Sequence, residues 1–247
     1  MFTCGPDTSS NSNCVLKGGF EQVKIEDSTI EGYTLEMASF VGITFDGFSG
    51  SSISAFASAP TTVTCVDCIW QNFNANFVVN MGVETGVPTS EVMRMELTGN
   101  SIVRDGQGGT LFSNDMGTLV FDDVTMQNLD AISVIATSNN GVTMLHKVLL
   151  DTADVNSVSM SSNGGVQDVV NMTVTGLTAV NDVFNAQGEG SMISMFNVNI
   201  ENNLIQGASP FTGVRVLNGA TGVVRRSSMI GNTGVSVRMD RTTKWYL

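Results

Sequence analysis

Four residues of this chain have the chemistry of a catalytic site: the adjacent carboxylates Asp122 and Asp123, the single histidine His146, and Arg225. Paired carboxylates can serve as acid and base on a glycosidic bond, and a basic residue beside carboxylates can abstract a proton. Neighbouring residues of a strand point to opposite faces, so Asp122 and Asp123 cannot both flank one bond from a strand. Asp123, His146 and Asn171 also share a repeated polar position, which favours a hydrogen-bonded ladder at a corner over catalysis.

The cysteines Cys4, Cys14, Cys65 and Cys68 allow three disulfide pairings, and the sequence does not choose among them. Cys65-Val-Asp-Cys68 has the CxxC spacing of redox and zinc motifs, but the chain lacks the second pair of ligands that zinc needs. We therefore expect no metal and no cofactor. Disulfides are typical of an oxidising compartment, so the cysteines favour an extracellular or cell-surface location. The N-terminus shows no signal peptide.

Composition and charge exclude several functions. The 247 residues are 42% hydrophobic and 14% charged, with a formal net charge of −12, which argues against nucleic acid as a partner and against docking on an anionic membrane. No apolar run reaches the roughly 18 residues of a membrane span. Residues 211–247 hold six bases and one acid. This basic end either docks an acidic partner or, as we favour, protects the exposed strand edges of the last structural element.

Asn171-Met-Thr173 is the one sequon for N-glycosylation. Asp105-Gly-Gln-Gly-Gly-Thr resembles the start of a calcium loop, but the bidentate Glu that such a loop needs does not follow at the right spacing. We predict a turn for this segment.

The elements that must position these residues follow from a repeat. Two apolar residues spaced by two, a polar residue, a later apolar residue and a closing Asn, Gly or Asp recur in nine copies. The copies lie at 23–32, 41–50, 63–72, 95–104, 119–128, 142–151, 167–176, 193–202 and 223–232. Period-two apolar spacing marks strands with one buried face, and Gly and Asn tolerate the left-handed backbone of a sharp corner. The later apolar residue includes Trp70, Ile102 and Leu149, and the closing residue includes Asn72 and Arg104.

One short strand pair cannot bury its own apolar face, but stacked copies can, with like columns about 4.8 Å apart. The columns therefore predict a parallel β-helix, and the variable copy length argues against the regular left-handed form. Leucine-rich, helical and calcium-binding nonapeptide repeats fit worse, and an immunoglobulin-like sandwich, the remaining alternative, does not explain nine aligned columns. Pro88 and Pro210 fall in the two longest intervals, so 81–91 and 206–213 are predicted to be projecting loops, where binding usually resides.

These columns resemble the right-handed parallel β-helix proteins of the pectin-lyase-like superfamily. CVLKGGFEQV at 14–23 is similar to the coil that opens many such domains, and CVDCIW at 65–70 is similar to a segment common in microalgal members. The resemblance covers residues 14–235 and is specific for the fold, which hosts enzymes, adhesins and inert scaffolds. The hydrolases of the superfamily carry NTD, paired Asp, Gly-His-Gly and RIK segments, and only Asp122-Asp123 matches here.

We thus expect an all-β chain forming a single right-handed parallel β-helix of about nine coils. Residues 1–22 would form an N-terminal cap, and 23–247 the β-helix domain with a C-terminal cap. The expected function is that of a non-catalytic extracellular or surface scaffold that binds a polysaccharide or protein partner through inter-coil loops. The alternative is a polysaccharide lyase or glycoside hydrolase of pectin-lyase-like fold. Carboxylates clustered with a base on one lateral face would favour the enzyme, and a face of Ser, Thr and Asn the scaffold. The pattern makes no prediction about the oligomeric state.

Overall fold

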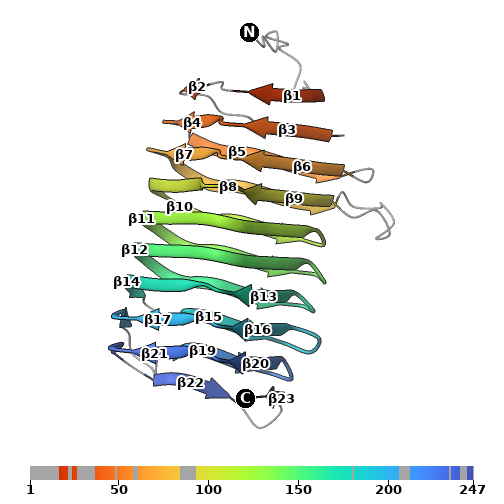
Figure 1. The fold of residues 1–247 in the computed structure, drawn as a ribbon. Helices are drawn as coiled ribbons and strands as arrows, with labels where there is room; N and C mark the ends of the chain where they lie inside the picture. The colour runs from red at the N-terminus through yellow and green to blue at the C-terminus, as the bar shows by residue number, and fades with distance from the viewer. Residues whose placement is uncertain are drawn as a thin grey trace.

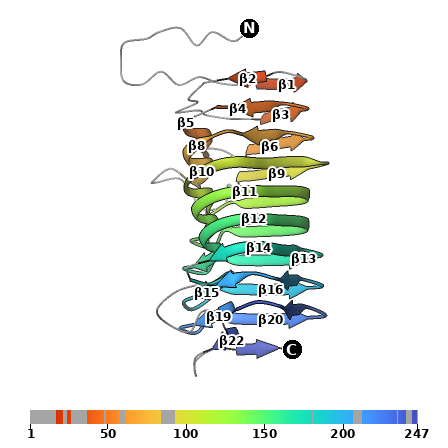
Figure 2. The ribbon, with the colours of Figure 1, turned by 90° about the vertical axis from the view of Figure 1, so that its left-hand side faces the viewer.

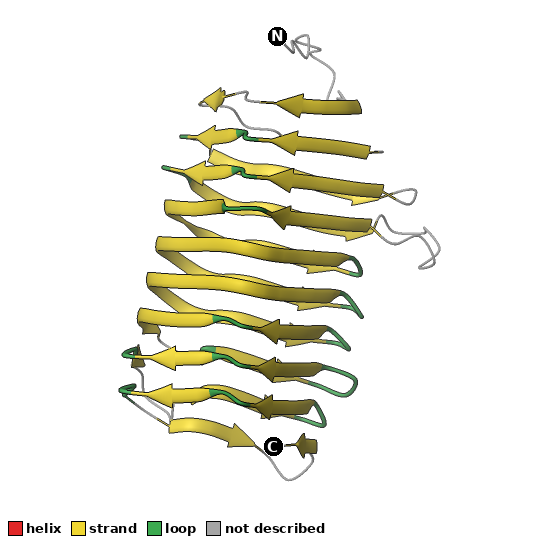
Figure 3. Ribbon diagram, viewed as in Figure 1, coloured by secondary structure: helices red, strands yellow, loops and turns green. Residues whose placement is uncertain are grey.

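The computed structural model describes ten stretches of the chain, which contain strands and turns and no helix (Figure 3). They are residues 17–21, 24–26, 37–47, 49–57, 61–83, 93–179, 181–205, 212–233, 235–239 and 244–246. The predictions made for Cys4, Cys14, Pro88 and Pro210 lie outside these residues, as does most of the loops predicted at 81–91 and 206–213.

The strands follow one another along the chain without any other regular element. They are β1 (Lys17–Glu21), β2 (Lys24–Glu26), β3 (Met37–Val41), β4 (Thr44–Asp46), β5 (Ser49–Ala57), β6 (Thr61–Val66), β7 (Ile69–Gln71), β8 (Asn74–Val83), β9 (Met93–Thr98), β10 (Ser101–Asp115), β11 (Thr118–Ser138), β12 (Val142–Ser162), β13 (Val166–Val170), β14 (Thr173–Ala179), β15 (Phe184–Gln187), β16 (Met192–Phe196), β17 (Asn199–Glu201), β18 (Leu204–Ile205), β19 (Thr212–Leu217), β20 (Thr221–Arg225), β21 (Ser228–Ile230), β22 (Val235–Met239) and β23 (Lys244–Tyr246).

The strand pairs that join these elements are parallel, and each strand pairs with its counterpart one coil earlier and one coil later. The chain winds right-handed from β1 at one end of the rod to β23 at the other (Figures 1 and 2). The predicted all-β, right-handed parallel β-helix is thereby confirmed. The rod makes about seven turns against the predicted nine or so, because the copy at 23–32 falls largely outside the described residues. Residues 17–21, assigned to the cap, form β1 and pair with β3.

Each coil has three sides. The first face is the sheet of β1, β3, β6, β9, β13, β16, β20, β23 and the N-terminal parts of β11 and β12. The second face, to its left in Figure 1, contains β4, β7, β14, β17 and β21. The third side contains β5, β8, β15, β19, β22 and the C-terminal parts of β10, β11 and β12.

Left-handed residues build the two corners that flank the second face. The first corner has positive φ angles of 50–72° at Gly42, Asp67, Gly99, Asp123, Lys147, Asn171, Asn197 and Arg226. The second corner has positive φ angles of 52–69° at Gly47, Asn72, Asp105, Asn128, Thr152, Gly176, Asn202 and Gly231. Gly, Asn and Asp occupy most of these positions because they tolerate left-handed backbone at the least cost. The corners therefore follow from the residue types that recur in the sequence.

The predicted columns are right in some coils and wrong by one residue in others. Asn72 closes its copy as predicted, whereas the left-handed residue after Arg104 is Asp105. Likewise Leu150, not Leu149, lies in the core, and Leu149 is 39% exposed. Both errors occur where two apolar residues are adjacent, as in Ile102-Val103 and Leu149-Leu150. A slip of one residue exchanges the buried and exposed sides of a strand, and a pattern with apolar residues on both sides does not fix the choice.

The interior of the rod is an apolar stack. Trp70 is fully buried, as predicted, and its ring stacks on Phe45 of the preceding coil at 5.2 Å between centroids. Phe112 and Phe121 meet edge to face at 4.9 Å. Large aromatic side chains in contact across coils supply most of the apolar area that holds such a rod together. This rigid interior fixes the positions of the outward side chains on all three sides.

Candidate functional site

The four residues with catalytic chemistry are not gathered into one cluster. Asp122 and His146 are register neighbours on β11 and β12, and both side chains point outward from the first face. Arg225 lies in the same column, but two intervening coils separate it from His146. Asp123 lies one residue further on, exposed at the first corner with φ 63°. The predicted divergence of Asp122 and Asp123 is therefore confirmed.

The pair formed by Asp122 and His146 has no hydrogen bond between its members in the described structure. The Nε2 atom of His146 is buried and has no hydrogen-bond partner among the described residues. Arg225 is exposed and follows Phe196 in its column. The described residues hold no group of three or more His, Cys, Asp or Glu side chains placed to bind a metal ion. The arrangement thus lacks the carboxylate cluster with an adjacent base that we expected of a lyase.

The polar column at the first corner is a hydrogen-bonded ladder in part. Asn197 Nδ2 donates to Asn171 Oδ1 at 2.7 Å, as that interpretation predicts. His146 does not belong to the column, because Lys147 takes the left-handed position in its coil. Asn171 is exposed at this corner, and its N-glycosylation stays a prediction.

The CxxC segment forms a disulfide inside the rod. Cys65 and Cys68 are bonded across the first corner with a Cα–Cα distance of 5.8 Å, and neither side chain is exposed. Redox-active cysteines are accessible to their partners, and this pair is not. The bond instead ties the two strands that meet at left-handed Asp67.

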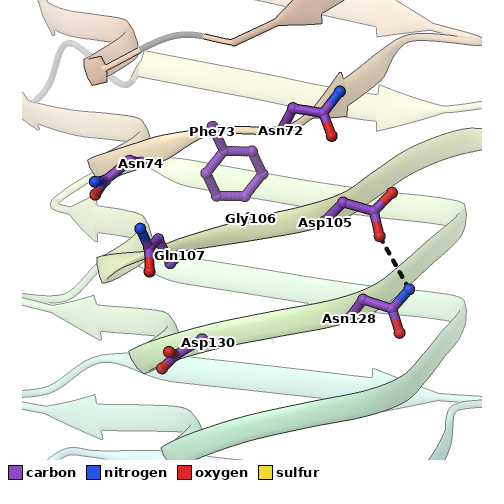
Figure 4. Close-up of a pocket in the computed structure, with 8 residues that line it drawn as sticks. All are labelled: Asn72, Phe73, Asn74, Asp105, Gly106, Gln107, Asn128 and Asp130. Atoms are coloured by element: carbon purple, nitrogen blue, oxygen red, sulfur yellow. Dashed lines mark hydrogen bonds between the residues drawn. The ribbon is translucent and has the colours of Figure 1, made fainter.

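A hollow of about 390 Å³ lies where three successive second corners stack, one above the other (Figure 4). Each corner contributes a left-handed residue and the residues that follow it. The lining consists of Asn72, Phe73, Asn74, Asp105, Gly106, Gln107, Asn128 and Asp130. Four of these eight side chains are amides and two are carboxylates, which are groups that hydrogen-bond in both directions or accept strongly.

The floor of the hollow depends on a glycine. A Cβ on Gly106 would lie 2.2 Å from the Phe73 ring, so only glycine leaves room for that ring. Phe73 is 2% exposed and fills the space beside Gly106 in the stack (Figure 4). The hollow is thus built on a fully packed base rather than on a loop.

Some polar groups of the hollow are occupied and others are free. Asp105 Oδ1 accepts a hydrogen bond from Asn128 Nδ2 at 2.9 Å, which fixes both side chains. In contrast Asn74, Gln107 and Asp130 are exposed and form no hydrogen bond with other described residues. Their strands pair in register, so the three side chains form one column along the rod. This column offers both donors and acceptors to a ligand.

The sequence analysis missed this site. It predicted a turn for Asp105-Gly-Gln-Gly-Gly-Thr, whereas the segment is a corner followed by strand, and three of its residues line the hollow. The available signal was the polar residue that stands two positions after each of three corners. Finding it needs the register between coils, which the misplaced closing residue Arg104 obscured.

Comparisons with protein-family models, with curated proteins and with solved structures find no match for this chain. In the described part of the chain, no helix is long and apolar enough to cross a membrane. The fold and the geometry of the sites therefore carry the functional argument.

Proposed function

We propose that this protein is a non-catalytic β-helix scaffold that binds a glycan at the hollow of the second corner. The observation that carries the proposal is the free column of Asn74, Gln107 and Asp130, which stands on a rigid base beside the fixed pair Asp105 and Asn128. Sugar hydroxyls both donate and accept, so amides and carboxylates held at fixed spacing are suited to recognise them.

The charge of the hollow favours a neutral sugar. Asp105 and Asp130 are both in the lining, and the guanidinium of Arg104 lies 3.6 Å from one oxygen of Asp105. The Arg104 Nη2 atom is also engaged, because it donates to Gln71 Oε1 at 2.8 Å. An acidic polysaccharide would place its carboxylates against these two carboxylates, and like charges held close together repel. The proposed ligand is therefore a neutral glycan.

An extracellular or cell-surface location is part of this proposal. The buried disulfide between Cys65 and Cys68 supports it, because structural disulfides persist in oxidising compartments. A polysaccharide of a cell surface or matrix would be accessible there. A protein partner is the alternative ligand class, and the binding experiment below separates the two.

The experiment is a calorimetric titration of the purified full chain with neutral and acidic oligosaccharides of matched length. We expect measurable binding of a neutral oligosaccharide, weakened about tenfold in Gln107→Ala and in Asp130→Asn. Asp154→Asn is the matched control, because Asp154 is exposed and follows Asp130 in register on the next coil but does not line the hollow. Absence of binding to every glycan, or equal loss in the control, would overturn the proposal and direct the search to a protein partner.

A carbohydrate-active enzyme is the second candidate, and one observation favours it. Asp105 and Asp130 stand in one hollow, and hydrolysis of a glycosidic bond needs two carboxylates flanking that bond. Release of reducing sugar or of an unsaturated product from a bound polysaccharide would show catalysis. If that release disappeared in Asp105→Asn and Asp130→Asn while binding persisted, the protein would be a hydrolase or lyase and not a scaffold.

A further inference from the structure

The outer surface of the first face differs from the rest of the rod. Five neighbouring strands or strand segments, from β11 to β20, align fifteen outward side chains in three columns. The columns are Thr118, Val142, Val166, Met192 and Thr221; Val120, Met144, Asp168, Ser194 and Val223; and Asp122, His146, Val170, Phe196 and Arg225. Eight of the fifteen are apolar. On the second face, by contrast, one of the eight outward residues between Thr125 and Glu201 is apolar, namely Leu149.

The apolar residues of the first face are contiguous. Val142, Val166 and Met192 follow one another in one column, and Phe196, which is 37% exposed, adjoins Val170 in another. Strands of neighbouring coils lie about 4.8 Å apart, so such side chains touch and form one surface. Single exposed apolar residues are ordinary, but a contiguous apolar surface on a flat sheet marks a site of protein association.

Charges at the two ends of this surface are opposite. Asp122 stands at the N-terminal end of its column and Arg225 at the C-terminal end, four coils apart. Neither side chain forms an ion pair with another described residue. The whole chain has the same asymmetry, since residues 1–210 sum to −17 and residues 211–247 to +5. An object with this charge pattern is complementary to a copy of itself turned end for end.

We propose that the first face is a self-association surface, on which two copies pack antiparallel about a twofold axis that runs along β13. This axis keeps each column facing itself and reverses the order of the coils. Asp122 of one copy then lies opposite Arg225 of the second copy, and Val142 lies opposite Met192. A twofold interface is isologous, so each such contact is made twice.

The alternative twofold axis, along the rod, fits less well. It would place each coil opposite the same coil of the second copy and would exchange the outer columns. Asp122 would then face Thr118, Arg225 would face Thr221, and the two basic ends would lie side by side. The observed charges favour the antiparallel arrangement because it alone brings opposite charges together.

The antiparallel dimer is weak for two reasons. Five strands at about 4.8 Å, each about 16 Å long, form a surface well below the roughly 800 Å² per partner of a standard interface. In addition Asp168 of β13 lies on the axis and faces its own copy, and like charges placed opposite each other repel. The second feature gives a diagnostic, because removing this charge should tighten the dimer while adding no apolar contact.

This surface is separate from the hollow, so the inference does not rest on the proposed glycan binding. The hollow lies at the second corner, and the self-association surface lies on the first face, on the other side of the first corner. Dimerisation can fail while glycan binding holds, and the reverse is equally observable.

The test is sedimentation velocity of the full chain over a wide range of concentrations. We expect a reversible monomer–dimer equilibrium, weakened at least tenfold in Val166→Lys, which places two new charges together on the axis. Thr125→Lys is the matched control, because Thr125 is a half-buried outward residue of the second face and should leave the equilibrium unchanged. Thermal melting of each variant establishes that it folds.

Charge exchange tests the geometry. Asp122→Arg and Arg225→Asp should each weaken the dimer, the double variant should restore it, and Asp168→Asn should tighten it several-fold. A wild-type chain that stays monomeric at the highest concentration would overturn the proposal. A dimer that Val166→Lys leaves intact would do the same, and failure of the double variant to restore association would overturn the antiparallel arrangement.

Discussion

The first face and the second corner stand on the same coils, yet their outer surfaces differ in kind. The first face presents Val, Met and Phe in contiguous columns, and the second corner presents Asn, Gln and Asp around a hollow. The interior beneath both is the same apolar stack, so packing of the core does not explain the difference. Outward positions of a β-helix are free of the core's demands, and their residue types therefore report what each side meets outside the molecule.

The two regions also differ in how their backbone is set. On the first face, strands run straight and side chains alternate in and out. At the second corner each coil bends through a left-handed residue, and Asp105 and Asn128 use that bend to hydrogen-bond across coils. A flat sheet suits a broad apolar contact, whereas a bent, polar edge suits a small ligand with many hydroxyls.

The largest effect is expected at the base of the hollow. Gly106→Val would drive a branched side chain into Phe73, whose ring lies 2.2 Å from the site of a new Cβ. We expect a loss of about 3 kcal/mol in the free energy of unfolding, as for severe overpacking of a core. Urea denaturation measures it. Gly109→Ala is the control, because its new Cβ would meet Asn76 O at 3.1 Å and should cost less than about 1 kcal/mol.

If both glycine variants cost the same, the close approach of Phe73 to Gly106 would not be what holds the hollow open. The hollow side of the comparison would then lose its structural basis.

The next effect separates the two surfaces in one pair of variants. Val166→Lys should weaken dimerisation by at least about 1.4 kcal/mol and leave glycan affinity unchanged. Gln107→Ala should weaken glycan affinity by a similar amount and leave the dimer unchanged, because the two residues lie on different sides of the coil. Sedimentation and calorimetry on both variants provide the four values. Loss of both properties in either variant would mean that the two surfaces are one.

A smaller effect concerns the fixed pair in the hollow. Asn128 has φ 52° and donates to Asp105, so Asn128→Ala loses the hydrogen bond and places Ala in left-handed backbone. We expect about 1–2 kcal/mol of destabilisation by thermal or urea unfolding. Asn128→Gly is the matched variant, which loses the hydrogen bond alone and should cost less. An equal cost in both would assign the whole effect to the hydrogen bond.

The smallest effect tests the corner one coil further on. Thr152 is β-branched and has φ 56°, a costly combination at a second corner. Thr152→Asn should stabilise the fold by about 0.5–1 kcal/mol, because Asn tolerates this backbone better. Thermal unfolding detects the gain. A loss would show that the contact between Thr152 Oγ1 and Asp151 Oδ1 outweighs the backbone strain.

The fold was predictable because its period is written in residue types. Period-two apolar spacing placed Val63, Cys65 and Trp70 in the core, and all three are fully buried. The repeated Gly and Asn indicated corners, and the structure places Asn72 and Asn202 at left-handed positions. Such local preferences need no knowledge of neighbouring coils.

The candidate site was not predictable, because it depends on alignment between coils. Leu149-Leu150 and Ile102-Val103 each offer two apolar residues to one core position, so the pattern left the register open by one residue. With that slip, Asp105 was not recognised as a corner and its alignment with Asn72 and Asn128 was hidden. Catalytic residue types were also misleading, since Asp122, Asp123, His146 and Arg225 attracted notice while the ordinary amides Asn74 and Gln107 did not.

The most direct test of the proposed function is hydrogen–deuterium exchange of the full chain with and without a neutral oligosaccharide. Binding at the hollow predicts slower exchange of the backbone amides in residues 72–74, 105–107 and 128–130, with the first face unchanged at 142–146 and 166–170. Protection confined to the first face, or no protection anywhere under saturating oligosaccharide, would contradict the assignment of the second corner as the glycan-binding site.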